Sequence, residues 1–491
     1  MSKQANSGDG YPADLLVDVR AGSVRGLRER LESALRAAVQ DGRLAAGAAL
    51  PPSRTLATEL AVSRSVVVET YANLKADGYL EARQGGGTRV RAEPGSGLPA
   101  RRAASDLGRA VDRDRRGYEP PRRPRPAEGS PRIRLFGGVP DPALFPRARW
   151  LRHYRGALAQ LPDSELTYPD MRGAPSLRAA LAAYLGRVRG VATAAERLLI
   201  CSGFTQGLTL TCRALRRRGA RRVAVEDPCF GHHREAIALA GLEPVPVAVD
   251  PLGFDPAGLS CDVDAVLVAP AHSYPAGYTL GAGRRHALIA WARHAGAIVI
   301  EDDYDAEFRY DRQPIGAIQG LAPQQVVYIG CASKTVTPAL RLGWVAAPSD
   351  LIDALEREKL YDDMGSTLLD QLTFARFIDC GDFSRYLRRV RPVYSSRRDA
   401  TIQALARYLP EARWVGEAAG LHLHVMLPDG VSELELGAAA YQRGVLVEDG
   451  AWHWAHPRQA PPSIVLGYGS TSEPVIRRGI EILAEALHAT R

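Results

Sequence analysis

Two short apolar runs constrain the fold of this chain most, because each is followed at once by polar residues. The runs are residues 297–300 and 326–329, which are rich in branched side chains. Runs of this length and composition predict strands buried on both faces of a parallel sheet. The polar groups that follow, residues 301–304 and 330–334, are therefore expected at the carboxyl ends of strands, where open α/β sheets bind ligands.

These polar residues share the chemistry of one cofactor. Lys334 can form a Schiff base with an aldehyde, and the carboxylate of Asp302 can keep a pyridine nitrogen protonated. The phenol of Tyr304 can bond a ring oxygen, while Ser333 and Arg341 can hold a phosphate. A lone lysine or aspartate would more often be ordinary surface. Together the five residues indicate pyridoxal 5'-phosphate.

The stretch resembles the fold-type I aminotransferases and, more narrowly, the MocR-type regulators, which join such a domain to a GntR-like DNA-binding head. The resemblance implies an α/β domain with a mainly parallel sheet and a smaller C-terminal α+β subdomain. It makes Lys334 the Schiff-base lysine, Asp302 the partner of the pyridine nitrogen and Tyr304 the partner of the phenolic oxygen. Ser333 and Arg341 would hold the phosphate.

A second phosphate contact is expected at residues 202–207, which follow the strand-like run 198–200 and open a predicted helix. Backbone N–H groups and the dipole at a helix start attract anions. A serine and glycine before a helix are usually only a cap. The place of this segment in the family's series is what assigns Gly203, Phe204 and Thr205 to the cofactor.

Three further positions follow the family's order. Phe230 occupies the place of the aromatic ring that stacks on the cofactor, although most phenylalanines are simply core residues. Tyr168 matches a tyrosine that reaches the phosphate of a neighbouring subunit. His272 lies where aminotransferases have an asparagine, and it either tunes the ring environment or is an ordinary satisfied loop histidine.

Two positions depart from the family pattern. Cys331 replaces a phosphate-binding serine three positions before the lysine. Val465 occupies the position of the arginine with which aminotransferases clamp the substrate carboxylate. Arg458 is close in sequence and is the one candidate to substitute for it. Without this arginine an amino acid has no evident anchor.

The first ninety residues predict a winged helix-turn-helix. Apolar residues recur at helical spacing from 27 to 39, and two further helices, 55–60 and 64–77, flank a turn at 61–63. Residues 79–83 and 88–91 form a predicted β-hairpin wing joined through 84–87. The whole segment resembles the GntR winged helix. The alternative is a small helical interaction domain with incidental arginines.

In such a head the amino end of the second helix of the motif enters the major groove of DNA. Arg64 and Ser65 lie at that end, where arginine can read a guanine edge and serine can hold a phosphate. Arg54 falls at a further contact position of the family, and Gly85 at the tip of the wing. These four residues are the predicted DNA contacts.

Charge and composition agree with this organisation. The net charge is +8, and residues 1–130 hold 22 Lys and Arg against 16 Asp and Glu, which favours a polyanion partner. We predict a DNA-binding domain at 15–91, a Pro/Arg-rich linker at 92–132 and the aminotransferase-like domain at 133–491. The six cysteines show no metal-binding spacing, so no metal site and reduced thiols are expected. No segment has the length and apolarity of a membrane span or signal peptide, which predicts a cytoplasmic protein.

The sequence thus predicts a pyridoxal-phosphate-dependent transcription regulator that binds a double-stranded DNA operator. The resemblance implies a head-to-tail homodimer in which one subunit's head lies over the other's large domain. Val465 favours sensing of pyridoxal phosphate itself and control of vitamin B6 synthesis over other effectors. Three alternatives stay open: a regulator that responds to a small amine or amino acid, as GABA-responsive relatives do, an active aminotransferase, and a DNA-binding protein with an empty cofactor pocket.

Overall fold

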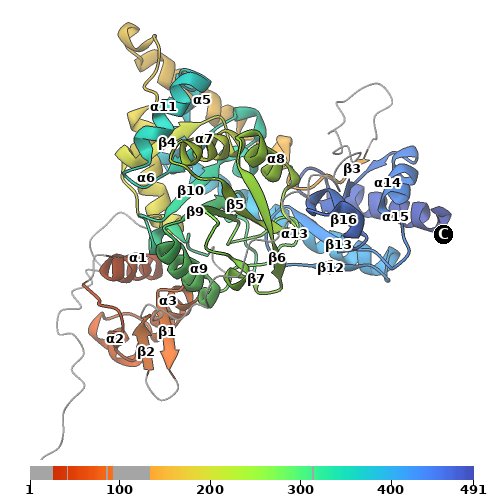
Figure 1. Cartoon of the computed structure of the whole chain (residues 1–491), viewed down its shortest axis with the longest axis horizontal. Helices are drawn as coiled ribbons and strands as arrows, with labels where there is room; N and C mark the ends of the chain where they lie inside the picture. The colour runs from red at the N-terminus through yellow and green to blue at the C-terminus, as the bar shows by residue number, and fades with distance from the viewer. Residues whose placement is uncertain (1–25, 41–42, 84–86, 92–132, 312–314, 491) are drawn as a thin grey trace, which may run out of the picture.

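The structure of the chain, a computed structural model, describes residues 26–490 apart from 41–42, 84–86, 92–132 and 312–314. Figure 1 shows three parts: a small amino-terminal head at the lower left, a large α/β domain in the centre and a C-terminal subdomain at the right. The predicted linker 92–132 and the predicted start of the head at residue 15 lie outside the described residues.

An eight-stranded sheet forms the centre of the large domain, in the order β4-β11-β10-β9-β8-β5-β6-β7. The neighbours from β10 through β9, β8 and β5 to β6 are parallel, whereas β11 runs antiparallel to both β10 and β4. The mainly parallel sheet predicted from the sequence is confirmed. Its strands are β4 Leu198–Cys201, β5 Arg222–Asp227, β6 Glu243–Asp250, β7 Gly253–Phe254, β8 Ala265–Val268, β9 Ile298–Asp303, β10 Val326–Cys331 and β11 Gly343–Ala346.

Helices cover both faces of this sheet because its strands are apolar on both sides. Along β10, Tyr328 packs in one core with Leu181 and Phe374, while its neighbours Val327 and Ile329 pack in a second core on the opposite face. The first face carries α5 Arg147–Gln160, α6 Pro175–Arg189 and α12 Leu368–Asp379. The second core contains residues of α7 Phe204–Arg217, α8 Gly231–Leu239 and α11 Ile352–Asp362, and α9 Ala282–Ala295 packs in a further core.

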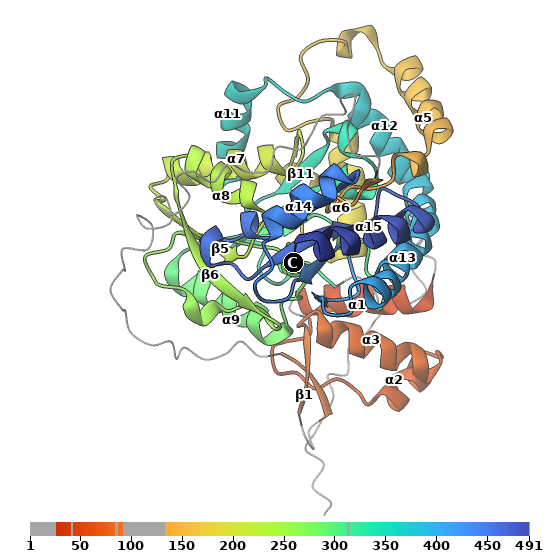
Figure 2. The same cartoon turned by 90° about the vertical axis from the view of Figure 1, so that its right-hand side faces the viewer.

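The C-terminal subdomain is α+β, as predicted, and lies at one end of the large domain, in front of it in the view of Figure 2. An antiparallel sheet in the order β12-β13-β16-β15 packs under three helices and shares one apolar core with them. A short strand pair, β14 with β3, ties the start of the large domain to it. The elements are β3 Ile133–Arg134, α13 Asp382–Tyr408, β12 Arg413–Val415, β13 His422–Met426, α14 Glu433–Gln442, β14 Val445–Leu446, β15 Glu448–Asp449, β16 Ser463–Gly467 and α15 Glu473–Thr490.

The head is the predicted winged helix-turn-helix. It consists of α1 Leu27–Gln40, α2 Ser53–Glu59, α3 Arg64–Ala76 and the antiparallel hairpin of β1 Leu80–Arg83 with β2 Gly87–Val90. Its core contains Leu31, Leu35, Val67 and Leu74. These residues recur at helical spacing on α1 and α3, so the two helices bury their apolar faces against each other.

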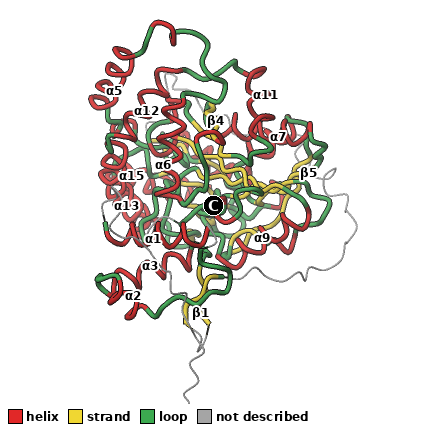
Figure 3. The backbone as a smooth tube through the Cα atoms, turned by 90° about the vertical axis from the view of Figure 1, so that its left-hand side faces the viewer, coloured by secondary structure: helices red, strands yellow, loops and turns green. Residues whose placement is uncertain are grey.

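The head contacts the large domain of the same chain through α1 and the end of α3, as Figures 1 and 3 show. The Gly316 N–H donates to the Asp77 carboxylate at 2.7 Å, and Gln40 Nε2 donates to the Gly320 carbonyl at 3.1 Å. On α9, His286 Nε2 donates to the Gly78 carbonyl at 2.5 Å. The head is therefore held by specific polar contacts.

Among the helices of the described ranges, none is long and apolar enough to cross a membrane.

Candidate cofactor site

A cavity of about 610 Å³ opens at the carboxyl ends of β9 and β10. It brings together residues that the sequence separates by more than a hundred positions. The candidate residues that line it are Phe204, Thr205, Phe230, Asp302, Tyr304, Ser333, Lys334 and Arg341. The expectation that the two polar groups meet at one edge of the sheet is therefore met.

Asp302 suits a cationic ring nitrogen. Its side chain is buried, and its Oδ1 has no hydrogen-bond partner among the described residues. Burial, followed by the charges of neighbouring carboxylates, raises the pKa of Asp302 well above its usual range. A protonated pyridine nitrogen would supply both the missing hydrogen and an opposite charge, and so favour the carboxylate. Asp303 is occupied elsewhere, because it accepts from Arg189 at 2.7 Å and from the Tyr328 hydroxyl at 2.6 Å.

The Tyr304 hydroxyl is positioned by His272. His272 Nδ1 lies 3.0 Å from Tyr304 Oη and 3.0 Å from an oxygen of Asp305. His272 Nδ1 is thus placed between the Tyr304 hydroxyl and the Asp305 carboxylate, and this contact fixes the position of the phenol. Burial raises the pKa of Tyr304 well above its usual value, so the phenol stays protonated. His272 is therefore a satisfied loop histidine that contacts a cavity residue, and its effect on the cofactor ring stays a prediction.

Lys334 lies on a short helix, α10 Ala332–Thr335, directly after β10. A Cβ built on Gly138, which has a φ of +65°, would lie 3.0 Å from Lys334 Nζ. Gly138 therefore leaves room for the amine where a larger residue would press on it. Sequence reasoning missed this contact, although two consecutive glycines at 137–138 are a signal of close backbone approach.

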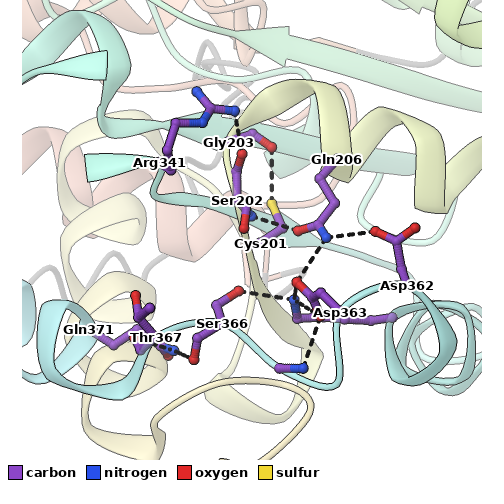
Figure 4. A network of polar contacts seen from close by, with 12 residues as sticks. Cys201, Ser202, Gly203, Gln206, Arg341, Asp362, Asp363, Ser366, Thr367 and Gln371 are labelled. Atoms are coloured by element: carbon purple, nitrogen blue, oxygen red, sulfur yellow. Dashed lines mark hydrogen bonds and ion pairs between the residues drawn. The ribbon is translucent and has the colours of Figure 1, made fainter. Parts of the chain in front are cut away.

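The opposite end of the cavity offers groups that suit an anion. Arg341 adopts a left-handed conformation with a φ of +46°, and its Nη2 donates to the Ser202 carbonyl at 2.5 Å (Figure 4). Gly203 has a φ of +90°, which favours glycine, and a Cβ there would lie 2.8 Å from that nitrogen. Since α7 begins at Phe204, the unpaired N–H groups of its first turn face this end. Cys331 also lines the cavity and offers only a weak donor.

Comparison with known proteins agrees with both parts of the chain. The family model "Bacterial regulatory proteins, gntR family" matches residues 27–90, and "Aminotransferase class I and II" matches residues 148–450. The HTH-type pyridoxine biosynthesis transcriptional regulator PdxR of Corynebacterium glutamicum is 31% identical over 477 residues, 97% of this chain and 99% of its own length. The probable rhizopine catabolism regulatory protein MocR of Rhizobium meliloti is 31% identical and covers 94% of each chain.

The chain belongs to the MocR-type transcription regulators. The large domain of this MocR-type regulator is also similar to the kynurenine aminotransferase of Pyrococcus horikoshii, with 26% identity, a TM-score of 0.67 and coverage of 79% of this chain and 95% of that one. The aminotransferase LysN of Thermus thermophilus, solved with a phosphopyridoxyl ligand, matches at 25% identity and a TM-score of 0.67 over 74% of this chain and 93% of that one. Pyridoxal 5'-phosphate is the cofactor of this domain, and the residues that line the cavity fit it.

Val465, the residue predicted to replace the carboxylate-binding arginine, lies outside the described lining of the cavity. Val465 is buried on β16, paired with His424 of β13 and Glu448 of β15. Within the part of the chain that the structure describes, the arginines that line the cavity are Arg213 and Arg341. Arg458 is exposed and lies outside the cavity lining, so the structure does not place it as a substitute.

The remaining predicted contacts lie elsewhere. Tyr168 is 75% exposed and outside the cavity lining, so within one chain it does not meet the cofactor residues. Arg54, Arg64 and Ser65 are exposed on the head, and the Ser63 hydroxyl caps α3 by accepting from Val66 N. Gly85 lies outside the described residues.

We expect Lys334→Ala to abolish the visible absorbance of the bound cofactor and its borohydride-reducible attachment. The chain has only four lysines, at positions 3, 75, 334 and 359, so peptide mapping after reduction identifies the site directly. Lys75→Ala, on α3 of the head, is the matched control and should keep the band. A reducible adduct that survives on another lysine would contradict the assignment.

Burial raises the pKa of Glu226, which lines a small pocket next to the cavity together with Asp302, to about 8. A carboxyl group with a raised folded-state pKa stabilises the fold below its unfolded pKa and loses that contribution as pH rises toward 8. Glu226→Gln cannot ionise, so the variant should gain stability over the wild-type protein as pH rises, by at most about 1.4 kcal/mol per pH unit. Thermal unfolding of the cofactor-free protein at pH 5 and pH 8.5 measures this, with the exposed Glu435→Gln as control.

Proposed function

We propose that this MocR-type regulator senses pyridoxal 5'-phosphate and controls genes of vitamin B6 synthesis. The observation that carries the proposal is that one strand, β9, serves both the cofactor cavity and the contact with the DNA-binding head. The name of the relative PdxR, a regulator of pyridoxine biosynthesis, supports the choice of target. The missing carboxylate arginine supports a ligand other than an amino acid.

Successive side chains of a strand point to opposite faces of the sheet. Asp302 lines the cavity, so Glu301 and Asp303 on either side point away from it. Glu301 accepts hydrogen bonds from the backbone N–H groups of Ile318 and Gln319, each at 2.9 Å. Asp303 binds Arg189. These two acids therefore anchor one segment on the far side of the sheet, residues 315–320.

This segment is also where the head is attached. Arg189 donates to the Ile315 carbonyl, and the next residue, Gly316, donates its N–H to Asp77 of the head. Asp77 is held in turn by Arg36 of α1 at 2.8 Å. A continuous series of buried polar contacts thus leads from the strand that holds Asp302 to the DNA-binding head.

The proposed mechanism is a population shift between head arrangements. When bound, the cofactor supplies a ring cation beside Asp302 and favours its carboxylate form. Burial and then the charge of Asp303 raise the pKa of Glu301 to about 7, so this anchor is electrostatically sensitive at neutral pH. A change of charge on Asp302 alters the electrostatic energy of the neighbouring acids Glu301 and Asp303. Because these acids hold residues 315–320, which contact the head, the preferred position of the head changes.

On DNA, we infer that the exposed amino end of α3 enters the major groove, with Arg64 reading a base edge and Ser65 and Arg54 binding beside it. Gly85 stays a predicted DNA contact on the strength of the family resemblance. A palindromic or repeated operator needs two heads, which a dimer supplies.

We further propose that the chain forms a homodimer. Exposed apolar side chains gather on two neighbouring segments near residues 166–168 and 360–364, namely Leu166, Tyr168, Leu360, Tyr361 and Met364. The segments are adjacent, since a Cβ on Gly365 would lie 2.7 Å from Pro169. Apolar surface of this kind indicates an interface. A second copy placed here would bring Tyr168 toward its partner, as the head-to-tail arrangement requires.

Two other functions are weaker candidates: an amino-acid- or amine-responsive regulator and a working aminotransferase. The set of Lys334, Asp302 and Tyr304 is chemically complete for transamination. Val465 at the carboxylate position argues against amino acid substrates. Half-transamination measured with a panel of amino acids separates the enzyme from the sensor.

For the head, Arg64→Ala should weaken specific operator binding by roughly 1–3 kcal/mol and relax base preference at one position. Arg64 is exposed at the start of the DNA-reading helix, so the substitution should leave the fold of the head unchanged. Fluorescence anisotropy on operator and random duplexes measures both affinities. Equal losses on the two duplexes would make Arg64 a backbone contact and shift base reading to Arg54 or Ser65.

For the sensor, adding pyridoxal phosphate to the cofactor-free protein should change operator affinity by about 5- to 150-fold, the usual range of allosteric coupling. Asp77→Asn should reduce this response while the cofactor band is kept, because Asp77 joins the head to residues 315–320. The exposed Glu29→Gln on α1 is the matched control.

Identical gel shifts and footprints with and without demonstrably bound cofactor would refute the sensor function. A normal response in Asp77→Asn would leave the sensor function standing but reject this route of coupling.

A further inference from the structure

The protein's own carboxylate lies behind one wall of the cofactor cavity. Glu448 of β15 is 3% exposed. Its Oε2 accepts hydrogen bonds from the Gly137 N–H at 3.2 Å and from the Tyr274 hydroxyl at 3.1 Å. Both donors belong to residues that line the cavity. The Gly137 N–H and the Tyr274 hydroxyl could bind an anion at this wall, but both donate to Glu448 instead.

The position of Glu448 is fixed by the antiparallel sheet of the C-terminal subdomain. Val465 of β16 pairs with Glu448 on one side and with His424 on the other, so the three side chains share one face of the sheet. A Cβ built on Gly137 would lie 2.9 Å from Glu448 Oε2 and 2.9 Å from Val465 Cγ1. Backbone, carboxylate and valine are thus in direct contact, with no space for an added anion between them.

The arginines of the described cavity lining are engaged in other contacts. Arg341 donates to the Ser202 carbonyl, and Arg213 is paired with Asp362 at 2.7 Å. Burial lowers the pKa of His422 well below its usual value and that of His424 to about 3, so both are neutral at pH 7.

The rest of this wall is aromatic. The Tyr274 ring lies 5.5 Å from the Phe230 ring and 5.0 Å from the His453 ring, and both contacts are edge-on. His453 Nε2 lies 3.4 Å from Glu448 Oε1, on the side of the carboxylate away from Gly137. Aromatic side chains favour an apolar or cationic group over an anion, because their faces carry partial negative charge.

We propose that the cofactor-loaded cavity accepts primary amines that carry no carboxylate and rejects α-amino acids, because Glu448 and Val465 occupy the place of a carboxylate-binding arginine. An incoming carboxylate would meet a like charge and would have to displace it from Gly137 and Tyr274. Specificity of this kind comes from a built-in repulsive element. The inference rests on the proposed function, since it requires pyridoxal phosphate bound at Lys334.

The test compares n-butylamine with L-norvaline, which differ only by the α-carboxylate. Each is titrated into the full-length protein loaded with pyridoxal phosphate, and the change in cofactor absorbance gives an apparent Kd. The same pair titrated into free pyridoxal phosphate corrects for intrinsic reactivity. We expect the protein to prefer butylamine by about tenfold or more after this correction, the scale of one unfavourable charge contact.

Two variants assign the preference to Glu448. Glu448→Gln keeps the shape of the side chain and removes its charge, so it should reduce the preference for butylamine several-fold. The double variant Val465→Arg/Glu448→Gln should reverse it. Glu433→Gln is the matched control: Glu433 is a buried carboxylate of the same subdomain that accepts from the Ala451 and Ser463 N–H groups, away from the cavity lining. It should leave the preference unchanged.

The outcomes separate the inference from the proposed function. If the visible absorbance band of the bound cofactor does not depend on Lys334, the proposed function itself is wrong. If the band is present and norvaline competes equally with butylamine, or if neither compound changes the absorbance, the inference is wrong. The inference is also wrong if Glu448→Gln and the double variant retain the full wild-type preference.

Discussion

The burial of three successive carboxylates, Glu301, Asp302 and Asp303, is the constraint around which the large domain is organised. They end β9 in the middle of a sheet whose faces are both covered, and each is at most 6% exposed. Burying unpaired charge is costly, so each group needs its own compensation. Glu301 accepts from two backbone N–H groups, and Asp303 accepts from Arg189 and from the Tyr328 hydroxyl. Asp302 instead faces the cavity.

This division of roles follows from strand geometry. Alternation along β9 sends the middle acid to one face and its neighbours to the other. Along β9, the residue that faces the cofactor cavity is therefore the direct neighbour of the residues that hold the segment in contact with the head. The cavity and the DNA-binding head are nevertheless different parts of the molecule. A regulator that couples the cofactor cavity to the head therefore needs only one connecting segment. Residues 315–320, held by Glu301 and Arg189 on one side and by Asp77 and Gln40 on the other, supply it.

The same fold that serves transamination in the similar aminotransferases is altered here at one end of the cavity. The phosphate end keeps an arginine, a glycine without space for a side chain and a helix start. The opposite end has Val465 and Glu448 in place of a cation. A carboxylate clamp contributes to binding by a forked pair of charged hydrogen bonds. We propose that its replacement by an internal carboxylate keeps the cofactor-binding chemistry intact and changes which small molecules can enter.

The sequence by itself determined the local elements and the types of residue at the cofactor site. Apolar runs before Asp302 and Lys334 predicted β9 and β10, and helical spacing with a turn predicted the DNA-binding head, because these signals span only a few residues. Tertiary structure alone decided that Glu448 lies against Gly137, that Gly138 faces Lys334, and that Asp77 meets Gly316. Each of these contacts joins residues 196 or more positions apart. Local sequence periodicity cannot predict contacts between residues so far apart in the chain, because these contacts depend on how whole sheets and subdomains pack.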